Sequence, residues 1–287
     1  MRPALLFSII FLSACAALQP SPPAPPAPRP VKIGLALGGG AARGFAHIGV
    51  IKTLEAHGIV PDIIAGTSAG AVVGALHAAG NDGFALQKLA SRLDKTQISD
   101  WSIPNRGLLK GEALQDFIND TVGQRPIQSL KIPFGAVATN LATGESILFR
   151  TGDTGLAVRA SSAVPGLFRP VEIGGREYVD GGLSSRIPVR SARLMGADVV
   201  IAVDISASPA GQPTNSTLGI FLQTFVIMGR NLAHYETREA DVVIQPRVGN
   251  VGAAEFQARH DAILEGERAA RAALPKIREA IKKASDK

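Results

Sequence analysis

The chain has 287 residues, of which 46% are hydrophobic and 19% are charged, and its formal net charge is +6. This composition excludes an intrinsically disordered chain, and the length suits one large domain with short appendages. Aromatic residues make up only 5% of the chain, whereas glycine occurs 31 times, which favours an α/β protein over a β-sandwich. No run of lysine and arginine follows the pattern of a nucleic-acid binder, so we expect no nucleic-acid partner.

The N-terminus predicts an export signal. Residues 1–14 contain one basic residue, Arg2, and the apolar run Ala4–Leu12, which is too short to be a permanent transmembrane helix. The signal ends in Leu-Ser-Ala-Cys, and Cys15 is the only cysteine, so no disulfide can form within the chain. This ending resembles the lipobox of bacterial lipoproteins, which implies that Cys15 is acylated and becomes the mature N-terminus. The alternative is an ordinary signal peptide with an incidental cysteine.

A proline-rich segment at residues 15–30 predicts a semi-extended tether between this anchor and the folded part. Ala16 follows the cysteine, where an acidic residue would favour inner-membrane retention. The lipoprotein resemblance therefore implies a bacterial cell-envelope protein that is lipid-anchored in the outer membrane and faces the periplasm. We expect one folded domain over residues 31–287, with a motif-bearing core at about 33–195 and a C-terminal helical and strand part at 196–287.

The folded part opens with two strand and helix pairs. The apolar run Val31–Leu37 predicts a buried strand, and apolar spacing predicts a helix over Phe45–His57. A second strand is predicted over Asp62–Ala65, followed by a small-residue helix over Ala69–Ala79. This alternation implies parallel strands joined by right-handed crossovers.

Two glycine-containing loops follow these two strands, at the sheet edge where α/β proteins bind ligands. The loop Gly38–Gly44 opens a helix, so its backbone N–H groups are free to face an anion. The second loop is a G-x-S-x-G elbow, in which Gly66 and Gly70 relieve crowding and expose the hydroxyl of Ser68. Together they predict a nucleophile beside a set of donors for a developing oxyanion.

The first loop has a rival interpretation as a dinucleotide-binding fingerprint. That motif requires a third glycine and an acidic residue at the end of the second strand. Ala41 stands where the glycine would be, and the second strand ends in the serine elbow, so we discount this interpretation.

A serine nucleophile needs a base to remove its proton. None of the five histidines lies in a glycine-rich loop after a strand, so we expect each to be a helix-surface or core residue: His47, His57, His77, His234 and His260. Asp180 is the better candidate, because it follows the extended segment Arg176–Val179 and precedes the turn glycines Gly181 and Gly182. The alternative interpretation of Asp180 is a plain Asp-Gly hairpin turn.

Taken together, these residues resemble the patatin-like phospholipases. The resemblance rests on the order of four segments: Val31–Arg43, Gly66–Gly70, Ala160–Val171 and Asp180–Gly182. It implies a mostly parallel central sheet in a three-layer α/β/α fold. It also implies a Ser–Asp dyad without histidine, with Ser68 as the nucleophile and Asp180 as the base, and neither a cofactor nor a metal.

The resemblance further implies an oxyanion hole built from Gly38, Gly39, Gly40, Ala41 and Arg43. The family loop usually has glycine where this chain has Ala41. Alanine keeps the N–H donor but disfavours a positive φ, so the oxyanion hole is expected to survive if Ala41 lies in the right-handed region.

The remaining chain predicts four further strands, at Ile132–Thr139, Ser146–Arg150, Asp198–Asp204 and Asp241–Gln245. We expect Leu218–Met228 to be a core helix, with a membrane-facing or acyl-pocket helix as the alternative. Trp101 is either a packed indole or an interfacial anchor. Arg259–Lys283 predicts a charged, solvent-facing helix that is broken near Pro275.

The leading functional hypothesis is a lipid acyl hydrolase of phospholipase A or lysophospholipase type, acting on membrane phospholipid. The second is an esterase or thioesterase that uses the same residues on soluble acyl compounds. The third is a non-catalytic lipoprotein that binds lipid or a protein partner. The presence of Ser68, Asp180 and Arg43 argues against the third hypothesis, because a binding module has no need of a strained elbow.

Overall fold

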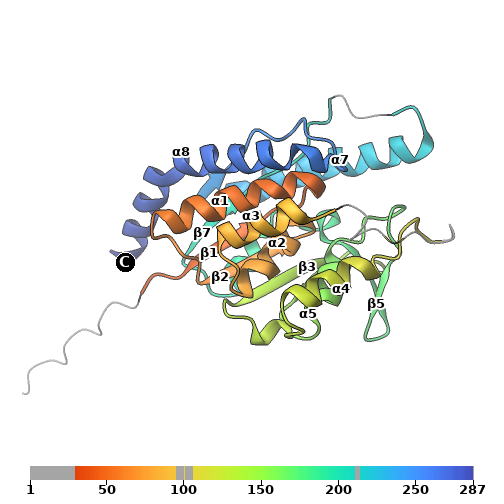
Figure 1. The fold of residues 1–287 in the computed structure, drawn as a ribbon, viewed down its shortest axis with the longest axis horizontal. Coiled ribbons are helices and arrows are strands. Elements are labelled where there is room, and N and C mark those ends of the chain that lie inside the picture. The colour runs from red at the N-terminus through yellow and green to blue at the C-terminus, as the bar shows by residue number, and fades with distance from the viewer. Residues whose placement is uncertain (1–29, 95–99, 101–105, 211–213, 287) are drawn as a thin grey trace, which may run out of the picture.

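The computed structural model describes residues 30–94, 100, 106–210 and 214–286 (Figure 1). A mixed sheet of eight strands forms its centre, in the order β5-β6-β3-β2-β1-β7-β8, with β4 paired to β3. The parallel strands are β1 (Ile33–Leu37), β2 (Ile63–Thr67), β3 (Phe134–Asn140), β7 (Val199–Val203) and β8 (Val242–Ile244). Strands β4 (Ser146–Phe149) and β6 (Arg176–Asp180) run antiparallel to β3, and β5 (Val171–Ile173) pairs antiparallel with β6.

Helices cover both faces of this sheet and make three layers. One face carries α1 (Phe45–Ala56), α2 (Ala69–Ala78), α3 (Gly83–Arg92), α4 (Glu112–Thr121), α5 (Thr154–Ser161) and α8 (Arg259–Ser285). The other face is covered by α6 (Val189–Leu194) and by the C-terminal half of α7 (Thr217–Glu236), which place Ala192 and Ala233 on the sheet. The predicted three-layer α/β/α fold is therefore confirmed, whereas α3, α4 and α5 were not predicted.

The first two predicted strands are neighbours and parallel. Leu37, at the end of β1, lies opposite Gly66, near the end of β2. The glycine loop and the serine elbow therefore leave the sheet side by side at the same edge, as the motif order predicted.

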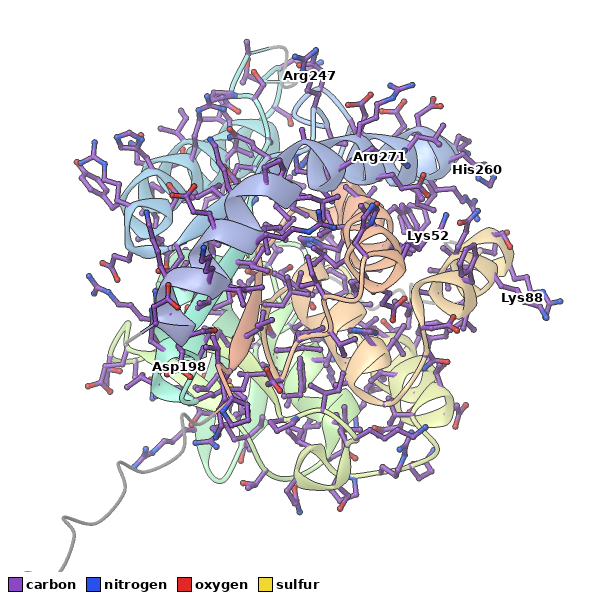
Figure 2. All side chains as sticks on the ribbon, turned by 90° about the vertical axis from the view of Figure 1, so that its left-hand side faces the viewer. Lys52, Lys88, Asp198, Arg247, His260 and Arg271 are labelled. Carbon is purple, nitrogen blue, oxygen red and sulfur yellow. The ribbon has the colours of Figure 1, made fainter. Side chains whose placement is uncertain are left out.

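The C-terminal helix differs from its prediction in two ways. It runs through Pro275 without ending, and it buries a stripe that includes Ile263, Gly266 and Ile277. A Cβ atom at Gly266 would lie 2.0 Å from the carbonyl oxygen of Ala46, so only glycine allows α8 to approach α1 this closely. Its charges point outward, as Figure 2 shows for Arg271 and His260, but the helix as a whole is part of the core.

The expectation that Leu218–Met228 is a core helix is wrong. Its apolar side chains at Ile220 and Met228 are 57% and 54% exposed in the described structure. A continuous apolar run does not indicate which face of a helix is covered. Here only the C-terminal half of α7 packs on the sheet, and the residues before it do not. Trp101 lies outside the described residues. Among the described helices, none combines the length and the apolar character that crossing a membrane requires.

Candidate active site

Ser68 sits on a sharp turn between β2 and α2. Its backbone adopts φ 53° and ψ −120°, a left-handed conformation that costs a non-glycine residue about 1–3 kcal/mol. The turn is tight enough to need glycine on both sides: a Cβ at Gly66 would lie 2.5 Å from the carbonyl oxygen of Gly70, and one at Gly70 only 2.1 Å from that of Leu37. The sequence thus forces the strained turn that presents the Ser68 hydroxyl at the N-terminus of α2.

A second serine, Ser161, holds the elbow in place. Its hydroxyl accepts a hydrogen bond from the amide of Ser68 at 2.9 Å and donates one to the carbonyl of Val137 at 2.6 Å. Ser161 is fully buried at the end of α5, which ties the elbow to β3. Ser161 belongs to the segment Ala160–Val171 that resembles the patatin-like phospholipases, but its sequence context indicated no role for it.

Asp180 ends β6 at the level of the elbow. Asp180 pairs with Ala138 of β3. On the other side of β3, Thr67 pairs with Val137, the residue before Ala138. The chain then turns across β3, and a Cβ at Gly181 would lie 2.2 Å from the carbonyl oxygen of Val137, so glycine is required there. Because β6 ends here in a short 3₁₀ turn, Asp180 does not belong to an Asp-Gly hairpin.

The Asp180 carboxyl group is buried, with 1% of the residue exposed. Burial raises its pKa above the ordinary value of 3.8, and the hydroxyl of Ser68, the amide of Gly182 and the charge of Arg186 each act in the opposite direction. Oδ1 accepts the Gly182 amide at 2.7 Å, whereas Oδ2 has no hydrogen-bond partner of ordinary geometry among the described residues. One carboxylate oxygen is therefore positioned by the turn and the other is available for a proton.

A buried arginine faces this carboxylate. Arg186 is 4% exposed, and burial lowers its pKa, while Asp180, Asp204 and Glu236 raise it. Its guanidinium also lies over the ring of Phe225, 5.8 Å from the ring centre. The sequence analysis missed Arg186, because a single arginine between two predicted elements gives no local signal.

The glycine loop has fewer free amides than the sequence suggested. The amides of Gly38 and Gly39 donate to the carbonyls of Val203 and Arg186 at 3.1 and 3.0 Å, and that of Arg43 donates to Gly40 at 3.2 Å. Within the described part of the chain, the amides of Gly40 and Ala41 have no such partner. These two N–H groups are the ones left for an oxyanion.

Ala41 does not meet the condition set for the oxyanion hole, because its backbone is not right-handed. Its φ is 52°, in the left-handed region that costs alanine about 1–2 kcal/mol. The loop needs this conformation whatever residue stands there, because the chain must turn from the end of β1 into α1. The position usually taken by glycine in the family therefore carries strain in this chain.

The Arg43 side chain binds protein carbonyls. Its Nε donates to Ile205 at 3.2 Å and its Nη1 to Val251 at 2.6 Å. Burial and the nearby charge of Arg186 lower its pKa to about 10. The guanidinium thus holds two C-terminal loops against the glycine loop, and the Arg43 amide is occupied by Gly40.

His47, on α1, forms a hydrogen bond to the same glycine loop. Its Nε2 lies 2.8 Å from the carbonyl oxygen of Gly38, and the ring is completely buried on α1. Burial lowers its pKa to about 4, so the ring is neutral at pH 7 and Nε2 carries the proton that it donates. His57 and His77 bind backbone carbonyls of their own helix ends, which agrees with their expected structural roles.

An apolar cavity of about 270 Å³ opens at Ser68. Its walls come from α1, α2, α4, the turn after α5 and the loop before α8, and include Phe45, Val72, Leu114, Phe117, Leu167 and Phe256. Ala41 and Ser68 both line it, so the glycine loop and the serine elbow border the same space. Such a cavity suits an acyl chain.

A serine elbow and an anion-facing loop at the carboxyl edge of an α/β/α sheet are typical of serine hydrolases. The patatin-like phospholipase family model matches residues 35–193, and the chain belongs to this family. One NTE family protein of Mycobacterium tuberculosis is 43% identical over 182 residues, covering 63% of this chain and 51% of the relative. Another from the same organism is 32% identical over 275 residues, covering 84% and 46%. The chain thus spans about half the length of these relatives.

The solved structure of VipD from Legionella pneumophila has a similar fold. The TM-score is 0.59 at 15% sequence identity, and the match covers 89% of this chain and 67% of the VipD chain. At this identity the similarity supports the fold alone.

Proposed function

We propose that the chain is a serine acyl hydrolase that cleaves carboxylic esters of phospholipids or lysophospholipids. The observation that carries the proposal is the hydrogen bond between the strained Ser68, which lines an apolar cavity, and the buried carboxyl group of Asp180. In this proposal Ser68 is the nucleophile and Asp180 is the base, without a histidine.

In the first step, Asp180 Oδ2 takes the proton of the Ser68 hydroxyl as the serine oxygen attacks the ester carbonyl carbon. The carbonyl oxygen becomes an oxyanion, which the free amides of Gly40 and Ala41 and the N-terminus of α2 stabilise. When the tetrahedral intermediate collapses, the proton passes from Asp180 to the departing alcohol. An acyl ester on Ser68 remains.

In the second step, Asp180 takes a proton from a water molecule that attacks this acyl ester. Collapse releases the fatty acid and returns the proton to Ser68. A carboxylate of ordinary pKa is a weak base for either step, so the burial that raises the pKa of Asp180 contributes to the rate. The Ser68 and Gly182 hydrogen bonds and the charge of Arg186 act in the opposite direction and favour the ionised carboxylate, which is the form that accepts a proton.

The substrate class rests on the cavity and on a relative. The cavity is walled almost entirely by apolar side chains, which favours a lipid acyl chain. A lysophospholipase of Debaryomyces hansenii is 32% identical over 189 residues, covering 64% of this chain but 12% of that protein. Soluble esters and thioesters remain the second candidate, because a short acyl chain fits the same cavity.

The test is covalent labelling followed by product analysis. Purified protein is expected to react with a fluorophosphonate probe, and Ser68→Ala is expected to abolish the label. Mass spectrometry of products from mixed phospholipids then distinguishes the substrates: free fatty acid supports the proposal. Turnover of soluble esters alone supports the second candidate, and labelling that survives Ser68→Ala contradicts both.

We also propose that Cys15 is acylated and anchors the protein in the outer membrane, facing the periplasm. The support is the apolar run before it and the resemblance of Leu12–Cys15 to a lipobox. Metabolic labelling with a palmitate analogue tests this directly, because Cys15→Ser removes the only cysteine. A label that persists in Cys15→Ser would contradict the anchor.

A further inference from the structure

The N-terminal half of α7 presents a stripe of apolar side chains to solvent. Ile220, Phe221, Ile227 and Met228 are 44–57% exposed, and their spacing of three or four residues, with Thr224 between them, places them on one face of the helix. Figure 1 shows this end of α7, drawn in cyan, reaching past the other helices. An exposed stripe of this kind on a soluble domain marks a surface that meets another apolar phase.

The segment that carries this stripe has no negative charge of its own. From Ile205 to Tyr235 the sequence contains no acidic residue. Beyond the stripe, a polar hollow of about 370 Å³ is lined by Arg230 and His234 of α7 and by Arg238 in the short 3₁₀ turn that follows it. Asp204 also lines this hollow, but its carboxylate already accepts bonds from Ser206 and Gln245 at 2.9 Å each. The two acidic residues near Arg238 are engaged elsewhere: Glu236 accepts from Ser185 and Ile187, and Glu239 pairs with Arg190.

The stripe lies next to the apolar cavity of the active site. A methyl group at Gly166 would lie 3.4 Å from the ring of Phe221 and 3.7 Å from Leu218, so α7 rests against this turn. Val164 and Leu167, in the same turn, line the cavity at Ser68. Apolar surface therefore continues from the outside of α7 to the acyl cavity with only this turn between them.

We propose that α7 is the surface by which this protein docks on an anionic phospholipid bilayer. The helix lies in the plane of the interface, with Ile220, Phe221, Ile227 and Met228 among the acyl chains and with Arg230 and Arg238 among the lipid phosphates. This inference rests on the proposed function, because a lipid substrate must leave the bilayer to reach Ser68. A second copy of the chain is the competing occupant, but the acid-free segment around the stripe and the basic Arg230 and Arg238 favour a negatively charged surface over a copy that carries the same charges.

The chain offers a clean local probe of this docking. Cys15 is the only cysteine, so the full-length Cys15→Ser, Thr224→Cys variant carries one thiol, in the middle of the stripe. An environment-sensitive dye on that thiol is expected to shift to shorter emission wavelength when phosphatidylglycerol vesicles are added. The background also carries Ser68→Ala, so that docking is measured without any hydrolysis.

The matched control places the same dye at Leu194→Cys. Leu194 is 79% exposed at the end of α6, shortly before β7 begins. It therefore lies at the amino ends of the parallel strands, opposite the edge that carries Ser68. We expect no shift there, and lipids that carry a quencher in the acyl chain should quench the dye at 224 only. Equal responses at both positions, or none at 224, would overturn the proposal. A shift at 224 that depends on protein concentration and not on lipid would assign the stripe to a second copy.

Introducing negative charge into the apolar stripe extends the test to activity. Ile227→Glu with Met228→Glu is expected to weaken binding to phosphatidylglycerol vesicles by about 100-fold, because two side chains lose their place in the apolar phase. Hydrolysis of vesicle lipid falls with it, while fluorophosphonate labelling of Ser68 stays unchanged. If the unsubstituted protein does not react with the fluorophosphonate probe at all, the proposed function is refuted, whereas the docking measurement is unaffected. Vesicle binding that survives the double substitution would refute the docking.

Discussion

The two turns that leave β1 and β2 make an instructive pair. Each places a non-glycine residue in the left-handed region, Ala41 at φ 52° and Ser68 at φ 53°. At the elbow the strain serves the chemistry, because only a residue with a hydroxyl can be the proposed nucleophile. At Ala41 the side chain contributes a methyl group and the backbone contributes the amide. Strain of similar origin is thus required for function in one turn and dispensable in the other.

The largest effect is expected from Ser68→Gly. Activity should fall by about 10⁴-fold or more, because the proposed nucleophile is lost. The unfolding free energy should rise slightly, since glycine adopts this φ without strain. Ester hydrolysis and urea unfolding measure the two quantities, and a variant that is inactive but less stable would show that the turn is not strained.

A large loss of stability is expected from Gly70→Ala. The new Cβ would lie 2.1 Å from the carbonyl oxygen of Leu37, so one backbone segment must move, at a cost of about 3 kcal/mol. Gly252→Ala is the matched control, because its nearest contact would be an ordinary 3.4 Å. Equal unfolding free energies in the two variants would mean that Gly70 does not pack as tightly against the end of β1 as described.

The pH profile separates chemistry from strain. Because burial raises the pKa of Asp180, the active carboxylate form is lost as pH falls through a value above 3.8, and kcat/KM should fall about tenfold per pH unit below it. Stability has the opposite sign: a raised folded-state pKa contributes stability at low pH that is lost as pH rises through it. Asp180→Asn should abolish activity across the whole pH range, because the proposed base is lost. Activity that survives in Asp180→Asn would assign the base to another residue.

A smaller effect is expected from His47→Leu. The carbonyl of Gly38 loses its donor, which should cost about 1–2 kcal/mol and lower kcat several-fold through a looser glycine loop. His57→Leu, at the exposed end of the same helix, controls for the general effect of losing a histidine. Since His47 has a pKa of about 4, the shape of the pH profile above pH 6 should not change.

The smallest effect is expected from Ala41→Gly. Relief of the left-handed strain should add about 0.5 kcal/mol to the unfolding free energy, after the extra flexibility of glycine in the unfolded chain is subtracted. Activity should stay within about twofold, because the amide donor remains. A large loss of activity would show that the alanine methyl group positions substrate in the cavity.

The sequence predicted the strands and helices that carry the two turns because glycine and apolar periodicity are local signals. It did not predict which amides remain free, since Gly38 and Gly39 bind carbonyls of residues far along the chain. Arg43 and Arg186 raise the same difficulty, because their partners come from other loops. The exposure of α7 was missed for a related reason: hydrophobicity predicts burial, but coverage depends on where the sheet ends.

One contact has a consequence for synthesis and export. The face of α1 that includes Gly49 packs against α8, where a Cβ at Gly49 would lie 1.9 Å from the carbonyl oxygen of Ile263. Because Ile263 lies far along the chain from Gly49, this part of the core cannot close until α8 has been synthesised. A chain that is threaded through a translocon must stay unfolded until it has crossed. A core that depends on so distant a contact delays folding, which suits the export predicted from residues 1–14.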